Sequence, residues 1–195
     1  MVFKDGKSIV YVAFREIYFN HKQLGLFLRL TLVVGLLVTR YLINPKSYIS
    51  NQKLRNMPYP EMLVAPMRAQ LEEVGFTSLM TPNEVEGALN DKTGTKLLVF
   101  NSVCGCAAGT CRPGVMKAVK DSAKIPSSLL TVFAGQETDA VAKAREFTAP
   151  YPPSSPSIAL YKNGELVHFI ERHMIEGRSA DMIAMNLQAA FEEYC

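Results

Sequence analysis

The sequence predicts an α/β domain in which helices flank a central mixed sheet of four strands. Short apolar runs typical of buried strands lie at residues 96–101 and 128–133, and each is followed by a helix-compatible stretch. A third run, 157–161, is joined to a fourth, 165–170, through Asn163-Gly164, a two-residue hairpin signal. Strands joined through helices are expected to be parallel with right-handed crossovers. The hairpin is expected to add an antiparallel edge.

Two helices are expected before the first of these strands. The earlier one covers residues 60–74, with glutamates on its outer side. Its apolar side chains are Met62, Leu63, Met67, Ala69 and Leu71. The later one covers residues 82–90 and begins at Thr81, with Pro82 in the first helical position and Glu84 completing a capping box.

Three further helices are expected between and after the strands. One follows the cysteine-rich segment and ends near Ser122, and Pro113 is expected either to kink it or to delay its start. Another covers residues 138–147, and the last covers residues 179–194. The side chains of the last helix expected to face inward are Met182, Ile183, Leu187, Ala190 and Phe191.

The chain has 195 residues and a formal net charge of +3, but its charge is unevenly distributed. Residues 1–56 hold nine Lys or Arg against two acidic residues, and the remainder holds 12 basic against 16 acidic residues. The main domain, residues 57–195, therefore offers no basic surface of the kind that binds nucleic acid. Nucleic acid is accordingly not expected among the partners.

Residues 1–56 are expected to form an N-terminal extension outside the main domain. Within it residues 24–43 are apolar, but only 17 residues, an arginine among them, separate Lys22 from Arg40. A membrane-spanning helix needs about 20 mostly apolar residues, so this segment is a marginal candidate. Three interpretations stay open: an extension without function, for instance because translation starts at Met57; a membrane anchor; or a helix that packs on a surface.

Two cysteines one residue apart lie where the first predicted strand passes into a helix, in the segment Cys104-Gly105-Cys106. The first N–H groups of a helix have no partners within the helix and carry the positive end of its dipole. A thiolate at that position is stabilised, so its pKa falls, and the thiolate is the form that attacks disulfides. The sequence therefore predicts a redox nucleophile, Cys104, with Cys106 as its helper. The alternative is two inert buried thiols.

The cysteine pattern also allows a metal site. Three of the four cysteines lie within eight residues, which is unlike the disulfide framework of a secreted protein. Cys104, Cys106 and Cys111 supply three thiolates for zinc or an iron–sulfur cluster, although no fourth ligand lies nearby in the sequence. Cys111 follows Cys104 by seven residues, two turns of a regular helix, and is either a packed side chain or a second resolving thiol. Cys195 is expected to be incidental.

Several longer segments accompany the cysteine pair: NSVCGCAAG at 101–109 with Arg112-Pro113, PSSPSIAL at 153–160, HFIERH at 168–173 and IEGR at 175–178. Through these segments residues 57–195 resemble the bacilliredoxins, thioredoxin-fold proteins with Cys-Gly-Cys in place of Cys-x-x-Cys. The predicted order of strand, helix, strand, helix, strand, hairpin, strand and helix agrees with a thioredoxin-like domain. Two extra helices precede it in this chain.

The resemblance implies a thiol–disulfide oxidoreductase. Its activity would be removal of the low-molecular-weight thiol bacillithiol, or a similar thiol, from mixed disulfides on protein cysteines, with disulfide reductase or isomerase activity in addition. Cys104 would be the nucleophile and Cys106 the assisting thiol. The partners would be S-thiolated proteins and the thiol co-substrate, with no bound cofactor or metal. The location would be cytoplasmic, or membrane-tethered if residues 24–43 are an anchor.

The resemblance also implies residues that contact the substrate. Ser155 and Pro156, at the start of a strand, are expected to bind substrate, and Pro156 is expected to be a cis-proline that presents substrate backbone to Cys104. The alternative for Pro156 is an ordinary rigid turn. Gly105, between the two cysteines, is expected to belong to the same surface.

Three basic residues complete the expected site. Arg172 and His173 would hold the carboxylates of an anionic thiol such as bacillithiol, and their alternative is an ordinary solvated face. Arg112, just after the cysteines, is expected either to contact the substrate or to favour a thiolate electrostatically.

Overall fold

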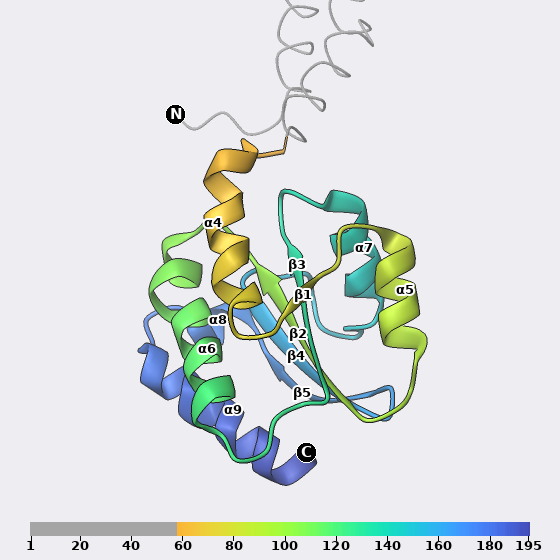
Figure 1. Ribbon diagram of the computed structural model, residues 1–195, viewed down its shortest axis with the longest axis vertical. Helices are drawn as coiled ribbons and strands as arrows, with labels where there is room; N and C mark the ends of the chain where they lie inside the picture. The colour runs from red at the N-terminus through yellow and green to blue at the C-terminus, as the bar shows by residue number, and fades with distance from the viewer. Residues whose placement is uncertain (1–57) are drawn as a thin grey trace, which may run out of the picture. The chain divides into compact units, whose positions relative to one another are not determined.

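A five-stranded mixed sheet lies at the centre of residues 58–195, the part of the chain that the computed structural model describes (Figure 1). Its strands are β1 (Thr77–Ser78), β2 (Thr95–Asn101), β3 (Ser128–Phe133), β4 (Ser157–Lys162) and β5 (Glu165–Ile170). They lie in the order β1-β3-β2-β4-β5. The expectations for residues 1–56, including the apolar segment 24–43, fall outside the described residues.

The thioredoxin-like α/β fold is confirmed, with one strand more than the four expected. β2 and β3 are parallel, and β4 and β5 form the antiparallel hairpin around Asn163-Gly164. The additional strand, β1, pairs in parallel with β3 through Thr77 and Ser78. A strand of two residues is too short to show an alternating pattern, so the sequence carries no signal for it.

The expectation that helix-linked strands are parallel is confirmed for β2 and β3 and is wrong for β3 and β4. Helix α7 (Thr138–Glu146) follows β3, but the chain then continues through residues 147–156 before β4 begins. Ser157 pairs with Phe100, so β4 starts at the edge of the sheet where β2 ends and runs antiparallel to β2. The long return segment therefore reverses the direction that a simple crossover would have produced.

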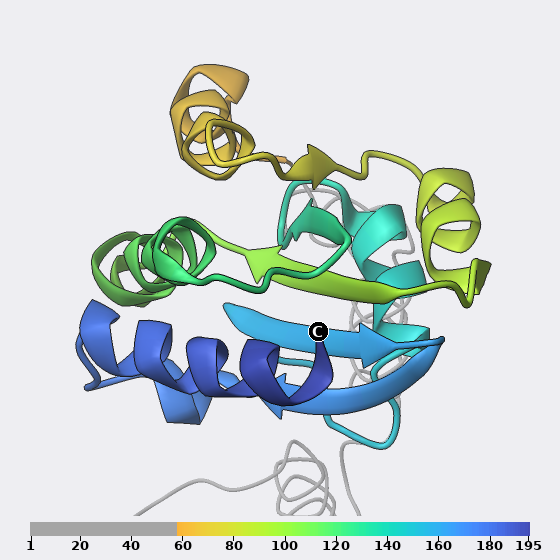
Figure 2. The ribbon, with the colours of Figure 1, turned by 60° about the horizontal axis from the view of Figure 1, so that its bottom comes forward.

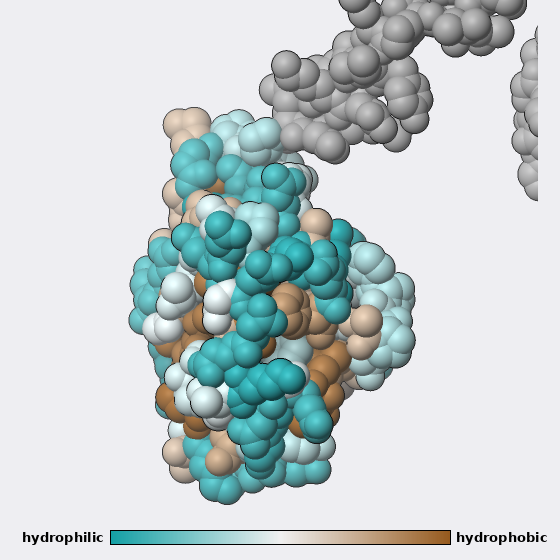
Figure 3. All heavy atoms as spheres, turned by 90° about the vertical axis from the view of Figure 1, so that its right-hand side faces the viewer, coloured by the Kyte–Doolittle hydropathy of each residue, from teal (hydrophilic) through white to brown (hydrophobic). Residues whose placement is uncertain are grey.

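Helices cover both faces of the sheet (Figure 2). α6 (Arg112–Asp121), α9 (Ala180–Tyr194) and α4 (Glu61–Glu72) pack on one face, and α5 (Pro82–Asn90) and α7 pack on the other. Every residue of β2 is buried: Leu97 and Val99 face the first layer, and Leu98 and Phe100 face the second. This alternation confirms the prediction that the strand before the cysteines is buried on both faces. Figure 3, which views the side of α5 and α7, shows hydrophilic residues in a band over the surface with apolar residues on either side.

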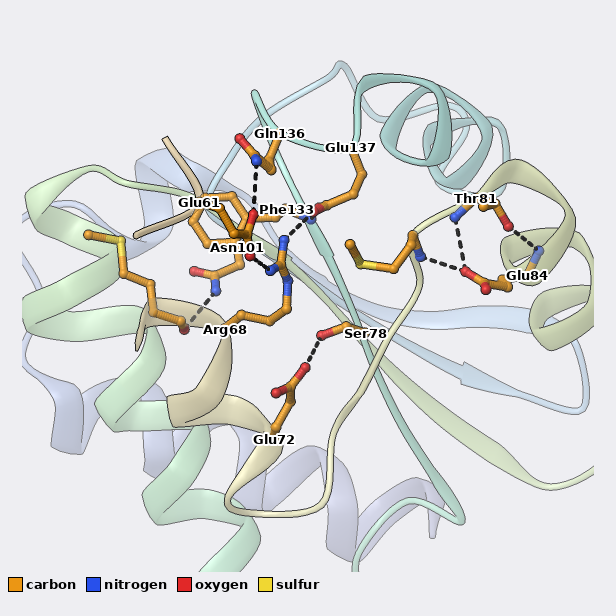
Figure 4. A network of polar contacts seen from close by, with 12 residues as sticks. Glu61, Arg68, Glu72, Ser78, Thr81, Glu84, Asn101, Phe133, Gln136 and Glu137 are labelled. Carbon is orange, nitrogen blue, oxygen red and sulfur yellow. Dashed lines mark hydrogen bonds and ion pairs between the residues drawn. The ribbon is translucent and has the colours of Figure 1, made fainter. Parts of the chain in front are cut away.

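The prediction for the inner face of helix α4 is confirmed only in part, since Leu71 is buried as expected. Met62 and Leu63 are exposed, and the buried residues are Val64, Arg68 and Leu71. The apolar residues of this helix are distributed around its whole circumference, so their spacing in the sequence did not identify one inner face. Arg68 lies on the inner face because its guanidinium pairs with Glu137, ahead of α7 (Figure 4).

The predictions for the other helices are largely confirmed. The capping box of α5 is present, since Glu84 N–H donates to Thr81 Oγ1 and Thr81 N–H donates to Glu84 Oε2. In α9 the expected inner residues are buried except Met182, which is 50% exposed. The short helix α8 (Arg172–Ile175), between β5 and α9, was not expected.

Candidate active site

The two cysteines lie directly after β2, where the chain turns into a helix. Ser102 and Val103 form the turn, and helical geometry begins at Gly105. Residues Ala107–Cys111 form a π-helical turn in which Arg112 N–H donates to the carbonyl of Ala107, and α6 continues from Arg112. Of the two effects expected from Pro113, the late start is observed for the regular α-helix, since α6 begins at Arg112 with Pro113 in its first positions. Such π turns occur frequently at functional sites.

Cys104 and Cys106 are joined by a disulfide, with 5.4 Å between their Cα atoms. Both residues are partly buried, and Gly105 between them is exposed. A Cβ added to Gly105 would have no neighbour within 4 Å, so the space in front of the pair is open. The two sulfurs are thus within bonding distance of each other and accessible to a reacting partner.

Two hydrogen-bond donors lie against the Cys104 sulfur. Ser102 Oγ is 3.2 Å from Cys104 Sγ, and Ala107 N–H, at the start of the helix, donates to the same sulfur at 3.3 Å. Hydrogen bonds to the charged form of a group lower the pKa of an acid. The predicted helix-start environment of Cys104 is therefore present, and Ser102 adds a hydroxyl that the sequence analysis missed. Its position, two residues before the nucleophile at a strand end, was the available signal.

The proline loop reaches the same edge of the sheet. The Ser155–Pro156 peptide bond is cis, as expected, and a second cis bond, Ala149–Pro150, was not expected. Because Ser157 pairs with Phe100, Pro156 lies beside the end of β2 that leads to the cysteines.

The expected substrate-binding residues on α8 lie next to this loop. Arg172 Nη1 donates to the carbonyl of Ser155 at 3.2 Å, and Arg172 Nε donates to Glu176 at 2.6 Å. His173, the next residue, is exposed. The neighbouring loop also approaches the cysteine helix, since Thr110 Oγ1 donates to the carbonyl of Arg178 at 3.0 Å. The structure thus brings Arg172 to the cis-proline, and binding of an anionic thiol there stays a prediction.

Arg112 occupies a different environment from the other expected site residues. Its side chain is buried, with only 2% of the residue exposed. The guanidinium donates to Gln70 Oε1 at 2.7 Å, to Asn101 Oδ1 at 3.0 Å and to the carbonyl of Ser102 at 2.9 Å. All of these acceptors belong to the chain itself, so the guanidinium lies behind the cysteine turn and not on the open surface.

Cys111 is separated from the reactive pair. It is completely buried in the core layer with Val115 and Leu187, and burial raises the pKa of its thiol to about 12. Within residues 58–195 no three His, Cys, Asp or Glu side chains are grouped closely enough to hold a metal ion. The three-thiolate site of the competing hypothesis is therefore not assembled. Cys104 and Cys106 are bonded to each other, and Cys111 is buried in the core, so the three sulfurs do not form an open set of ligands.

Comparisons with known proteins agree with this geometry. A family model described as Disulphide isomerase matches residues 59–195. The bacilliredoxin of Cytophaga hutchinsonii is 62% identical over 135 residues, which cover 69% of this chain and 98% of that protein. The chain belongs to the bacilliredoxin family. Another bacilliredoxin, from Salinibacter ruber, is 51% identical over 140 residues, which cover 71% of this chain and 82% of that protein.

Solved structures of thioredoxins are also similar to the bacilliredoxin chain. Schistosoma mansoni thioredoxin has 15% sequence identity and a TM-score of 0.44, covering 63% of this chain and 97% of its own. Arabidopsis thaliana thioredoxin O2 has 16% identity and a TM-score of 0.42, covering 63% and 97%. As a member of the bacilliredoxin family, the chain is a thiol–disulfide oxidoreductase. Among the helices of residues 58–195, none has both the length and the apolar character that crossing a bilayer requires.

Proposed function

We propose that this bacilliredoxin removes a low-molecular-weight thiol of the bacillithiol class from mixed disulfides on protein cysteines. One observation carries the proposal: at the start of a helix, Cys104 Sγ accepts two hydrogen bonds and also forms a disulfide with Cys106, two residues along the chain. The first feature favours a reactive thiolate, and the second supplies an internal thiol that resolves a mixed disulfide.

The reaction is a sequence of thiol–disulfide exchanges. The Cys104 thiolate attacks the sulfur of the small thiol in the client's mixed disulfide. A new disulfide forms between Cys104 and the small thiol, and the client sulfur leaves as a thiolate that takes up a proton. Cys106, as a thiolate, then attacks Cys104 Sγ, which forms the disulfide seen here and releases the small thiol. Alternatively a second small thiol attacks the adduct and leaves as the symmetrical disulfide, which returns Cys104 to its thiolate.

The surroundings of the pair are suited to a small anionic partner and a protein partner at once. The open space at Gly105 admits a client cysteine. Arg172, half exposed beside the cis-proline loop, offers a positive charge to a carboxylate of the small thiol, with His173 next to it. This chemistry needs thiols that are kept reduced, so the proposed location is the cytoplasm.

The decisive experiment offers a bacillithiol-modified client protein to the wild type, Cys104→Ala and Cys106→Ala. We expect Cys104→Ala to release no client thiol. Cys106→Ala should accept the adduct and accumulate as a mixed disulfide with bacillithiol, detected by intact-protein mass spectrometry. Cys195→Ala is the matched control, because Cys195 is a free and exposed cysteine of the same chain, and it should behave as the wild type. Removal of the adduct by Cys104→Ala would overturn the assignment.

The identity of the small thiol is tested with the same client carrying glutathione in place of bacillithiol. Equal rates for the two adducts would show an exchange enzyme without preference for bacillithiol. A preference that disappears in Arg172→Gln would assign the recognition of the anionic thiol to the α8 side of the site.

A further inference from the structure

The guanidinium of Arg112 is a buried cation without a carboxylate partner among residues 58–195. It is 2% exposed, and burial lowers its pKa. Arg68 and Arg172, by contrast, pair with glutamates. A buried charge is costly unless it is paired and hydrogen-bonded, so an arginine held this way needs a balancing charge or many hydrogen bonds.

The hydrogen bonds of Arg112 lead to the nucleophile by a short path. Its guanidinium donates to the carbonyl of Ser102 and to Asn101 Oδ1, and this same oxygen accepts the N–H of Ser102 at 2.8 Å. The turn at Ser102 is thereby held from both sides. The Ser102 hydroxyl in turn lies 3.2 Å from Cys104 Sγ. One residue therefore connects the buried cation to the reactive sulfur.

Helix α4, which precedes the thioredoxin-like core in the chain, holds the other side of this network. Gln70 Oε1 accepts from Arg112 Nε at 2.7 Å. Asn101 Nδ2 donates to the carbonyl of Met67 at 3.2 Å (Figure 4). Helix α4 therefore helps to hold the cysteine turn in place. Its contact with the Arg112 guanidinium is a neutral amide, whereas an acidic side chain at that position would neutralise the positive charge.

We propose that Arg112 is a positioning residue for Cys104, which holds Ser102 against the sulfur and supplies the positive charge that balances the Cys104 thiolate. The proposal rests on Cys104 being the nucleophile of the proposed function. Of the two roles expected from the sequence, contact with the substrate and electrostatic support of a thiolate, the proposal takes the second and places Arg112 at the rear of the site. It also explains why the cation is buried beside amides and carbonyls only.

Charged or titratable side chains on the elements around this site include Glu61 and Arg68 of α4, Glu137 ahead of α7, Arg172, His173 and Glu176 of α8 and its end, and Arg178 after it. Arg68 is paired with Glu61 and Glu137, and Arg172 is paired with Glu176. His173 and Arg178 lie on the exposed side. Among these side chains of residues 58–195, Arg112 is a buried cation with no carboxylate partner, so its charge can balance the thiolate.

The test measures the pKa of Cys104 from the pH dependence of its alkylation in the reduced, full-length chain carrying Cys106→Ser and Cys195→Ser. The informative substitution is Gln70→Glu. A glutamate in place of Gln70 keeps an acceptor for Arg112 and strengthens the contact by a charge-assisted hydrogen bond. It also neutralises the guanidinium. We expect the pKa of Cys104 to rise by about one unit, with up to about tenfold slower alkylation at neutral pH.

A matched control is Gln188→Glu on α9, which adds the same charge at a residue with no described contact to this network. It should leave the pKa of Cys104 unchanged. A purely structural role of Arg112 predicts the opposite for Gln70→Glu, namely unchanged or increased stability with no change in the pKa. That result would overturn the proposal.

Two further variants test the same network, and Ser102→Ala does so without changing Arg112. Ser102→Ala removes the hydroxyl from the sulfur and should also raise the pKa of Cys104 by about one unit. Arg112→Lys keeps the positive charge but loses the planar guanidinium with its several donors. It should therefore lower the pKa of Cys104 by less than the wild-type arginine does. Since the alkylation rate needs no client and no bacillithiol, its outcome is independent of the client assay, and either hypothesis can fail without the other.

Discussion

Gly114 of α6 lies against Ile183 of α9 so closely that an added Cβ would be 2.7 Å from Ile183 Cβ. It would also be 2.8 Å from the carbonyl oxygen of Ala180. The helix that starts at the cysteines is therefore packed on α9 at a point that admits no side chain. This contact sets the position of the cysteine helix on its face of the sheet.

We expect Gly114→Ala to lower the free energy of unfolding by about 1–3 kcal/mol, because the extra methyl group forces α6 and α9 apart. Gly87→Ala on α5 is the control, since a Cβ there meets nothing within 4 Å and alanine is a better helix former. Urea denaturation followed by circular dichroism measures both. Equal denaturation midpoints for the two variants would contradict the tight packing of α6 on α9.

The buried ion pair of Arg68 and Glu137 should contribute more to the free energy of unfolding than the exposed ion pairs on the surface. The side chains are 10% and 6% exposed, and Glu137 also accepts the N–H of Phe133. Glu137→Gln removes the buried carboxylate of the two that pair with Arg68 and leaves only the more exposed Glu61, so we expect a loss of roughly 2–3 kcal/mol in the free energy of unfolding.

The control for this pair is Glu146→Gln, which breaks a pair with Lys143 whose carboxylate is 64% exposed. That substitution should cost less than about 1 kcal/mol. Chemical denaturation of the two variants at the same pH makes the comparison. A cost for Glu137→Gln as small as that for Glu146→Gln would show that the pair ahead of α7 does not hold α4 in place.

Cys111 should make the protein less stable in alkali. Burial raises the pKa of its thiol to about 12 in the folded chain from 9.0, the ordinary value expected in the unfolded chain. Above pH 9 the unfolded chain has lost this proton and the folded chain retains it. The free energy of unfolding should therefore fall with rising pH, by up to about 1.4 kcal/mol per unit, and the effect is absent below pH 9.

This slope is measured by denaturation of the oxidised protein between pH 8 and 10. At higher pH the buried hydroxyl of Tyr161, whose pKa burial also raises, adds its own contribution. Cys111→Ala should show a smaller slope than the wild type, and Cys195→Ala should keep the wild-type slope. If Cys111→Ala has the same slope as the wild type, the thiol is not protonated in the folded core.

The open space at Gly105 gives a prediction about access. Gly105→Leu should fold with nearly wild-type stability, because nothing lies within 4 Å of the added Cβ. The new side chain projects between the two cysteines, so release of thiol from a modified client should slow by at least about tenfold. Gly87→Leu on α5, on the opposite face of the sheet, is the control and should keep the wild-type rate. A rate of Gly105→Leu equal to that control would mean that clients approach from another direction.

Local patterns predicted the elements well, and the failures share a cause. The alternation in β2, the Asn163-Gly164 turn and the capping box at Thr81 depend on neighbouring residues, and all are present. The inner face of α4 and the direction of β4 depend on partners far away in the chain; the first was predicted only in part and the second wrongly. Arg68 faces inward only because Glu137 meets it there.

The sequence by itself determined the α/β class, the cysteine pair at a strand-to-helix turn and the cis-proline at Pro156. The first two follow from short-range backbone preferences and from a motif whose residues are adjacent in the chain, and the cis-proline follows from the resemblance to the bacilliredoxins. Only the tertiary structure decided that Cys111 is sealed in the core, that Ser102 lies on the Cys104 sulfur and that Arg112 is buried behind it. Those facts depend on which distant groups fold against each side chain, since burial and hydrogen bonding are properties of the assembled chain.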